Sequence, residues 1–232
     1  MNSAELKRIA AEKAVEFVED GMVLGLGTGS TAALAVDAIG RRVQAGLQVV
    51  AIPTSEATAA QASRLGIPLV DFADHETIDL TIDGADAVDR ATLDLVKGLG
   101  GALLREKLVA AISKRMIVIV DESKLAGAFG TRCPVPVEVV RFGWPTTSRR
   151  LAKLGCTPVL RRNVAGEPVV TDGGNYVLDC AFGAITDGAG LAMRIKQQIG
   201  VIESGLFIGL ATDIIVAASG GIEIIRRSGQ AG

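Results

Sequence analysis

The sequence predicts an α/β fold: a Rossmann-like, doubly wound and mostly parallel sheet, with a smaller α+β domain inserted before the C-terminal segment. Up to Val120, short apolar runs alternate with stretches of helical period. Repeated strand and helix units of this kind form a parallel sheet that helices cover on both faces. Beyond about Gly130 the pattern changes to extended segments with proline and a glycine turn, and the final segment returns to buried-strand character.

The first helix has clear start and stop signals. Asn2 can cap it, with Glu5 three positions later, and Gly21 can end it. One face would carry the apolar residues Leu6, Ile9, Ala10, Ala14, Phe17 and Val18. The elements expected next are a strand at 22–26, an alanine-rich helix up to Gly40, a strand at 47–52, a helix at 56–65, strands at 67–72 and 78–82, a helix at 103–113 and a strand at 116–120.

The signals of a smaller domain follow. Residues 133–137 (CPVPV) and 169–180, with the turn DGGN at 172–175, are typical of extended chain and a hairpin. Helical patterns at 146–154 and 191–199 interleave with them, and the segment 205–227 contains a buried run at 214–217. We therefore expect a Rossmann-like catalytic domain of residues 1–130 plus 206–232 and a small α+β domain of residues 131–205.

Composition narrows the function classes. The 232 residues carry 24 Lys+Arg and 26 Asp+Glu, a net charge of -2, without a basic stripe, so nucleic acid is not an expected partner. Hydrophobic runs fall far short of the roughly 18 residues that cross a bilayer. The N-terminus lacks a signal-peptide pattern, so no membrane partner and a cytoplasmic location are expected. Three cysteines without CxxC spacing and a single histidine, His75 in a polar loop, predict reduced thiols and no metal site.

The loop after the first predicted strand, residues 25–31 (GLGTGST), is the first candidate site. Its glycines let the backbone approach an anion, and the helix that follows offers free N–H groups. It is not a dinucleotide motif, because Ser30 replaces the third glycine, nor a P-loop, because no GK[ST] follows. A phosphate site is favoured over a simple tight turn. At Thr54-Ser55, after the second predicted strand, helix capping and ligand contact remain equal alternatives.

Two further loops carry chemistry. Asp83 and Asp86, in DGAD, could accept hydroxyl hydrogens of a polyhydroxy substrate and shuttle a proton, although such turns are more often only turns. Lys97 precedes a glycine loop that enters a helix bearing Glu106. An ammonium beside a nascent oxyanion and a carboxylate base are the two groups that enolisation requires. For Glu106, and for Lys124 after a later strand, a solvated surface role is the alternative.

Taken together, the motifs GLGTGSTA, DGADAVD, KGLGGALLREKLVA and VDESK resemble those of A-type ribose-5-phosphate isomerase in order and spacing, from the first helix to about Val140. The resemblance implies an aldose-ketose isomerase of the pentose phosphate pathway, without metal or organic cofactor, acting on a sugar phosphate as a homodimer or homotetramer. It implies Glu106 as the proton acceptor, with Asp83, Asp86 and Lys97 also catalytic. The substrate-binding residues that it implies are Thr28, Gly29, Ser30, Thr31, Asp83, Gly84, Ala85, Asp86, Lys97, Gly98, Leu99, Gly100 and Lys124.

One departure lies inside the site: Leu99 stands where the family usually has glycine. We expect an ordinary backbone conformation there, with the leucine side chain in apolar packing beside Leu103. The alternative functions are a coenzyme A transferase-like enzyme, in which Glu106 would be a nucleophile, and a sugar-phosphate sensor domain. A related deaminase would need a catalytic histidine, and the context of His75 does not suit that role. No basic recognition helix of the kind that accompanies a sensor precedes the first strand.

Overall fold

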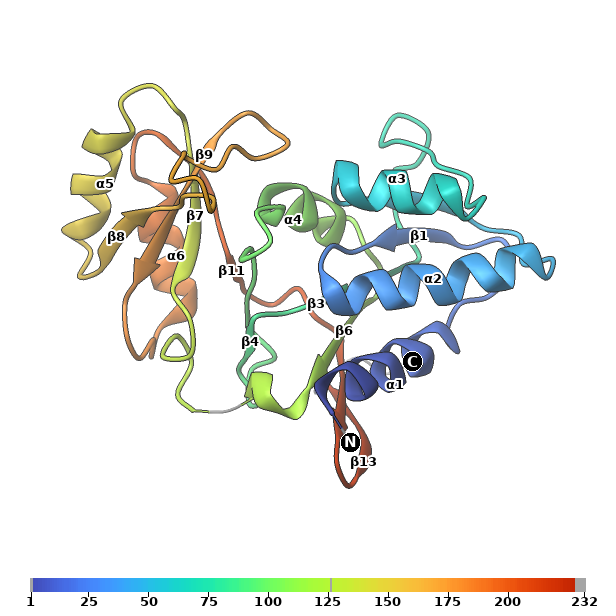
Figure 1. Cartoon of the computed structure of the whole chain (residues 1–232). Helices are drawn as coiled ribbons and strands as arrows, with labels where there is room; N and C mark the ends of the chain where they lie inside the picture. The colour runs from blue at the N-terminus through green and yellow to red at the C-terminus, as the bar shows by residue number, and fades with distance from the viewer. Residues whose placement is uncertain (1, 126, 228–232) are drawn as a thin grey trace. The chain divides into compact units, whose positions relative to one another are not determined.

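The structure, a computed structural model, describes residues 2–125 and 127–227 (Figure 1). The chain forms two compact units. The first combines the chain up to Ala85, Arg105–Lys124 and the segment from Gly209 onwards, and the second takes Asp86–Leu104 and Leu125–Ile208. These bounds differ from the expected 1–130 plus 206–232 and 131–205. Residues 86–104 group with the second unit because their short strands pair with a strand at Leu206–Phe207 and not with the main sheet.

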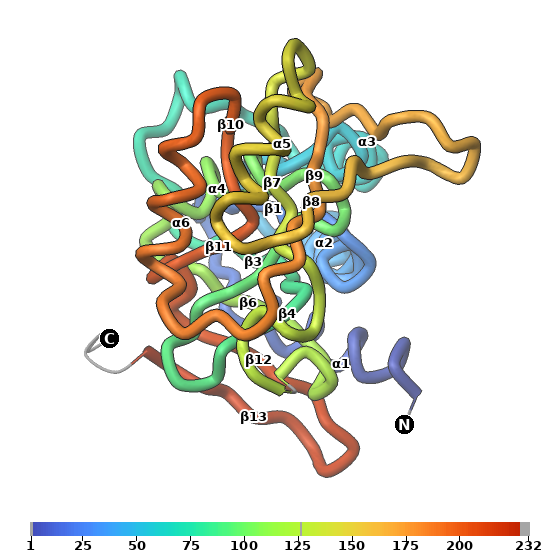
Figure 2. The backbone as a smooth tube through the Cα atoms, turned by 90° about the vertical axis from the view of Figure 1, so that its left-hand side faces the viewer, coloured from blue at the N-terminus to red at the C-terminus, as the bar shows by residue number. Residues whose placement is uncertain are grey.

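The first unit is built on a six-stranded sheet in the order β13-β12-β6-β3-β1-β2. Neighbouring strands are parallel except β12 and β13, which run side by side as an antiparallel pair (Figure 2). The strands are β1 (Val23–Leu26), β2 (Val50–Pro53), β3 (Leu80–Gly84), β6 (Met116–Asp121), β12 (Asp213–Ala218) and β13 (Gly221–Arg226). The mostly parallel sheet predicted from the sequence is therefore confirmed.

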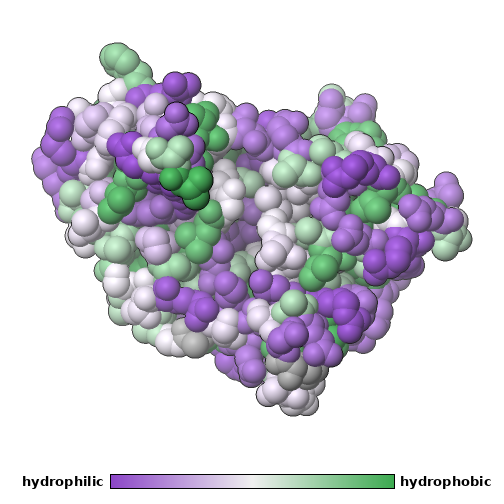
Figure 3. Space-filling view, viewed as in Figure 1, coloured by the Kyte–Doolittle hydropathy of each residue, from purple (hydrophilic) through white to green (hydrophobic). Residues whose placement is uncertain are grey.

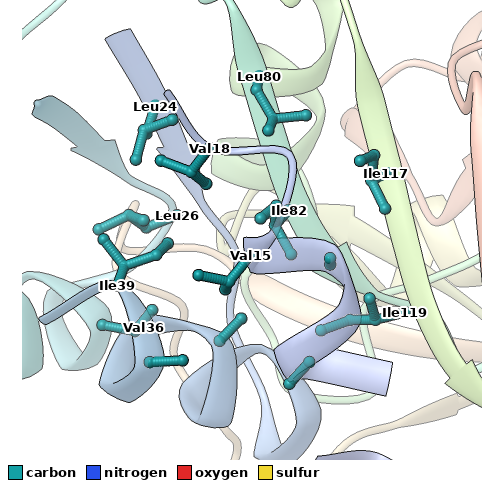
Figure 4. Packing of buried hydrophobic residues seen from close by; sticks show 14 of the residues in the cluster. Val15, Val18, Leu24, Leu26, Val36, Ile39, Leu80, Ile82, Ile117 and Ile119 are labelled. Atoms are coloured by element: carbon teal, nitrogen blue, oxygen red, sulfur yellow. The ribbon is translucent and has the colours of Figure 1, made fainter. Parts of the chain in front are cut away.

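Helices cover both faces of this sheet. The helices are α1 (Ser3–Val15), α2 (Ser30–Gln44), α3 (Glu56–Arg64) and α4 (Leu103–Ala111), with a 3-10 turn η1 (Glu122–Leu125) after β6. Figure 4 shows one face of the sheet packed against α1 and α2 through Val15, Val18, Leu24, Leu26, Val36, Ile39, Leu80, Ile82, Ile117 and Ile119. On the opposite face Val109 of α4 packs with Ile52 and Ile78. Successive residues of a strand thus point to opposite faces of the sheet, and each face packs against its own layer of helices, as in a doubly wound sheet.

Two expected elements need correction. Residues 67–72 do not form a strand, and only an isolated bridge joins Ala51 to Leu69. Pro68 has no N–H for a ladder, and Leu69 and Phe72 are exposed, so the pairing with β2 does not extend beyond this bridge. The first helix ends at Val15, before the turn at Gly21. Its predicted start is confirmed, because the Asn2 side chain accepts a hydrogen bond from the Glu5 N–H.

The second unit contains a four-stranded antiparallel sheet in the order β10-β7-β9-β8 and a three-stranded one in the order β11-β5-β4. The elements are β4 (Ala87–Val88), β5 (Leu95–Val96), β7 (Val135–Val139), α5 (Trp144–Ala152), β8 (Thr157–Leu160), β9 (Tyr176–Ala181), α6 (Gly188–Lys196), β10 (Val201–Ser204) and β11 (Leu206–Phe207). The core includes Val137, Leu178 and Leu151. The three cysteines are free thiols.

Hydrophilic residues predominate on the face of the first unit that Figure 3 shows, over α1, α2 and α3, and hydrophobic side chains are scattered among them. None of the helices among residues 2–125 and 127–227 has the length and apolar character needed to cross a bilayer.

Candidate active site

The order in which strands are added to the sheet reverses at the carboxyl ends of β1 and β3. The chain passes from β1 through α2 to β2 on one side, and then through α3 to β3 on the other side of β1. Ligands bind at such a switch point in open α/β sheets. The structure brings two predicted site segments together there: the Thr28 N–H donates to Asp83 Oδ1 at 3.2 Å, and the Gly84 N–H donates to the same oxygen at 2.7 Å.

Gly27 is what allows this close approach. A Cβ atom at residue 27 would lie 2.2 Å from Asp83 Oδ1 and 2.6 Å from Asp83 Cα. Both contacts are far inside van der Waals distance, so only glycine fits without movement of the strand end. The glycine-rich loop therefore fixes the carboxylate of Asp83 as well as leaving room for an anion.

The Thr28 hydroxyl belongs to a cluster of side-chain hydroxyls. It donates to Ser55 Oγ at 2.8 Å and lies 2.7 Å from Thr54 Oγ1 and 3.1 Å from Thr58 Oγ1. The Thr58 hydroxyl donates a hydrogen bond to the Gly27 carbonyl at 3.0 Å. Ser55 is the N-cap of α3 and accepts from the Thr58 N–H. The Thr54-Ser55 turn is therefore a helix cap and a support for Thr28, and both the hydroxyl and the N–H of Thr28 are used inside the protein.

The start of α2 has the features of an anion site. Gly29 precedes the helix with φ 110°, and no side chain caps the first turn. Its N–H groups and the helix dipole favour negative charge. Lys7 of α1 adds a cation, because its Nζ lies 3.1 Å from Ser30 Oγ. The predicted segment Gly29, Ser30 and Thr31 thus gains a cationic partner from α1.

Glu106 is 4% exposed, although it is a carboxylate in the first turn of α4. The register of α4 against β3 locates it. The Ile78 N–H donates to the Ile112 carbonyl, and Val109 approaches Thr81 across Gly25. One further turn back along the same helix face brings Glu106 toward the end of β3, where Asp83 stands. The solvated surface role of Glu106 is therefore wrong.

Lys124 lies in η1 at the carboxyl end of β6, the neighbour of β3. Asp121, the last residue of β6, accepts from the Ser123 N–H at 3.0 Å and starts this turn. Lys124 is partly buried, and it lies on the same edge of the sheet as Asp83.

In the second unit the β4 and β5 pairing brings Asp86 and Lys97 side by side. Ala87 pairs with Val96, and the Asp86 N–H donates to the Val96 carbonyl at 2.9 Å. The Lys97 side chain is buried, with its Nζ 5.5 Å from the centre of the Phe207 ring. Burial of an ammonium is costly, so a lysine held in this way is a functional candidate.

The loop after Lys97 is a tight turn. The Gly101 N–H donates to the Gly98 carbonyl at 3.0 Å, and both glycines have positive φ angles, 104° at Gly98 and 84° at Gly101. Leu99 has no positive φ, and its N–H donates to Asp86 Oδ2 at 2.9 Å. Its expected ordinary backbone conformation is confirmed. Leu99 is 44% exposed, so it is not enclosed in the apolar core, and its packing beside Leu103 stays a prediction.

Sequence reasoning missed Arg161, which donates from one nitrogen to the carbonyls of Gly98 and Leu99 at 2.8 and 2.9 Å. Nothing in the local sequence distinguishes it from Arg162, and it is more than 60 residues from the loop that it contacts. Among residues 2–125 and 127–227, no group of three or more His, Cys, Asp or Glu side chains is arranged to hold a metal ion.

Comparison with known proteins decides the family. Residues 50–221 match the family model of ribose 5-phosphate isomerase A (phosphoriboisomerase A). The chain belongs to the ribose 5-phosphate isomerase A family. A curated family member from Synechococcus sp. (strain JA-3-3Ab) is 55% identical over 97% of this chain and 98% of its own length. One from Gloeobacter violaceus is 56% identical over 96% of both chains.

Solved structures of the family share the fold. A D-ribose-5-phosphate isomerase in complex with phospho-erythronic acid superposes with a TM-score of 0.94 at 36% identity, covering 98% of this chain and all of the other. The ribose 5-phosphate isomerase from Plasmodium falciparum gives 0.93 at 39% identity, covering 97% and 99%. The family resemblance and the fold class predicted from the sequence are both confirmed.

Proposed function

We propose that this protein interconverts D-ribose 5-phosphate and D-ribulose 5-phosphate through an enediolate. The single observation that carries the proposal is the buried carboxylate of Glu106, in a chain of this family, near the strand end that bears Asp83. A carboxylate at the start of a helix and shielded from water is suited to take a proton from carbon.

The proton transfer balances with the side chains at hand. Glu106 removes the proton from C2 of the open-chain aldose, and the electron pair moves through the new C1–C2 double bond to O1. Lys97 stabilises the developing charge on the enediolate oxygen. Asp83 and Asp86 hold substrate hydroxyls, assist ring opening and relay the hydroxyl proton from O2 to O1. Glu106 then returns its proton to C1, which leaves the ketone at C2.

The phosphate binds at the start of α2. The uncapped N–H groups after Gly29, the hydroxyls of Ser30 and Thr31 and the nearby Lys7 ammonium support this part of the proposal. Thr28 acts chiefly as a support, because its N–H and hydroxyl are already used by Asp83 and by Ser55. The remaining substrate contacts that we propose come from Gly84, Ala85, Gly98, Leu99, Gly100 and Lys124.

C2 is oxidised and C1 is reduced within the same molecule, so no external oxidant or reductant is needed and a base and a cation suffice. We propose that the reaction proceeds without metal or organic cofactor. We also propose a role in the non-oxidative pentose phosphate pathway, a cytoplasmic location and a homodimeric or homotetrameric state. Light scattering during gel filtration measures the last of these. A monomer at working concentration would contradict it.

The decisive experiment mixes the purified protein with ribose 5-phosphate and follows ketose formation by absorbance. Glu106→Gln should lower kcat by about 10²–10⁴ with little change in KM, because the base acts only in the transition state. Glu12→Gln, at a carboxylate half-exposed on α1, is the matched control and should keep full activity. Absence of ketose from the wild type would remove the proposal, and a Glu106→Gln rate near half of wild type would remove the role of Glu106.

The same preparation separates the alternatives. A coenzyme A transferase-like enzyme would exchange thioesters with Glu106 as nucleophile, whereas an isomerase would not. A sugar-phosphate sensor would bind ribose 5-phosphate without producing ketose.

A further inference from the structure

Arg161, the residue directly after β8, is held in one orientation by Asp179 of β9. Its Nε donates to Asp179 Oδ2 at 2.9 Å and its Nη2 donates to Oδ1, so the pair is bidentate. The two side chains are 13% and 22% exposed. A planar guanidinium fixed on one edge by a carboxylate presents its remaining N–H groups in a defined direction.

The remaining N–H groups of Arg161 point toward the loop that follows Lys97. Arg161 Nη1 donates to two consecutive carbonyls, those of Gly98 at 2.8 Å and Leu99 at 2.9 Å. The opposite side of the same peptide is held as well, because the Leu99 N–H donates to Asp86 at 2.9 Å. The turn is thus hydrogen-bonded on one side to the Asp86 carboxylate and on the other to the Arg161 guanidinium. Two consecutive carbonyls can converge on one donor only in a narrow range of φ and ψ at the residue between their peptide planes, here Leu99, so this contact restrains the backbone of the turn.

The residue before this turn is equally fixed. The Lys97 N–H donates to the Gly205 carbonyl at 2.8 Å, and a Cβ at residue 205 would lie 2.1 Å from the Lys97 carbonyl oxygen. Lys97 therefore enters the turn from a rigid strand end, and Arg161 fixes the turn on its other side. Asp179 neutralises the guanidinium, so Arg161 supports the loop without adding net positive charge to it.

We propose that Arg161, oriented by Asp179, is a positioning residue for the proposed isomerisation: it holds the turn 98–101 in the conformation that the substrate meets. It contacts neither the base nor the reacting carbons in this role. The inference rests on the proposed function, because it assumes that this turn and Lys97 serve the sugar phosphate. Its effect falls on kcat, since a loosened loop still admits substrate but aligns it poorly.

Arg161→Met tests the proposal, with Arg162→Met as the matched control. Arg162 is the next residue, and its side chain donates to the Gly166 carbonyl in an exposed loop. Arg161→Met should lower kcat about 10–100-fold, the scale of a roughly 1 Å misplacement, with KM within a few-fold. Amide exchange at 98–101 should accelerate, and exchange in the first unit should stay unchanged. Arg162→Met should match wild type in both measurements.

Three further variants keep the test independent of folding defects. Arg161→Lys retains the charge but not the fork and should remain defective, whereas millimolar guanidinium should partly restore kcat to Arg161→Ala. Asp179→Asn should give a smaller loss of the same kind. Full activity in Arg161→Lys, or unchanged exchange at 98–101 in Arg161→Met, would overturn the positioning role. Amide exchange does not depend on turnover, so it tests whether Arg161 holds the turn 98–101 even if the wild type produces no ketose.

Discussion

Replacement of Gly27 by alanine tests the closest packing in the proposed site. The new Cβ would meet Asp83 Oδ1 at 2.2 Å, Cγ at 2.4 Å and Cα at 2.6 Å. Carbon atoms pack at about 3.5–4.0 Å, so the end of β1 and the end of β3 must separate by about 1 Å. The clash involves backbone, so rotation of a side chain cannot relieve it. Overpacking of this kind costs about 1–3 kcal/mol.

The expected results are a lower melting temperature and a lower kcat. For a chain of this length, 1 kcal/mol corresponds to roughly 2–4 °C, so Gly27→Ala should melt about 2–12 °C below wild type in calorimetry. Displacement of Asp83 by about 1 Å should reduce kcat by up to roughly 10²-fold. Both effects have one cause, and they should appear together.

Two glycine variants are the controls. Gly100→Ala meets no atom within 4 Å and has no positive φ, so it should melt within about 1 °C of wild type. Gly21→Ala also has open space but a φ of 83°, so it should lose about 1 kcal/mol through backbone strain and keep its kcat. If Gly27→Ala retained wild-type stability and rate, the close approach of Gly27 to Asp83 would not constrain the site as argued.

Three further predictions address other parts of the first unit. Thr28→Val should cost about 1–3 kcal/mol, because it removes a partly buried hydroxyl from its cluster and leaves its partners without it, whereas Thr28→Ser should lose much less; equal melting temperatures would contradict this. Lys7→Met should raise KM for ribose 5-phosphate several-fold and weaken competition by sulfate, and Lys13→Met, at a lysine paired with a glutamate elsewhere on α1, should do neither. Burial acts against the charge of Asp213, but its hydrogen bonds from Arg115 and a threonine hydroxyl, together with nearby cations, hold its pKa below the usual value. Its stabilising contribution is therefore present above the unfolded pKa of about 3.9 and lost as pH falls through the lower folded pKa, so Asp213→Asn should flatten acid unfolding below about pH 4; an unchanged acid limb would refute this.

Local patterns predicted the parts of the fold that local forces determine. The Asn2 cap of α1 and the continuous apolar run of β6 carry their own signals, and both are present. The segment 67–72 has an apolar composition typical of a strand, but Leu69 and Phe72 remain exposed, and only one bridge forms. Whether such a segment forms a strand depends on residues far away in the chain, and the local sequence does not contain that information.

The same distinction applies to the proposed site. The loops at Thr28, Asp83 and Lys97 were found because glycines and polar residues follow apolar runs, which is a local signal. Arg161 was not found, since its importance lies entirely in a contact with carbonyls far away in the chain. The role of Thr28 changed for a similar reason. Its hydroxyl meets Ser55 and Thr58, which follow β2, and the parallel pairing of β1 with β2 brings those residues beside it.

The position of β12 in the sheet has a consequence for the order of synthesis. This strand pairs in parallel with β6, Asp213 beside Ile117, and α1 packs on both. On the ribosome, α1 and β6 are translated before β12, their shared partner, which follows only after the whole of Leu125–Ile208. That segment supplies all of β7, β8, β9 and β10, so its four-stranded sheet can form without waiting. The nascent chain must therefore keep the apolar edge of β6 from wrong pairings while a later part of the chain folds first.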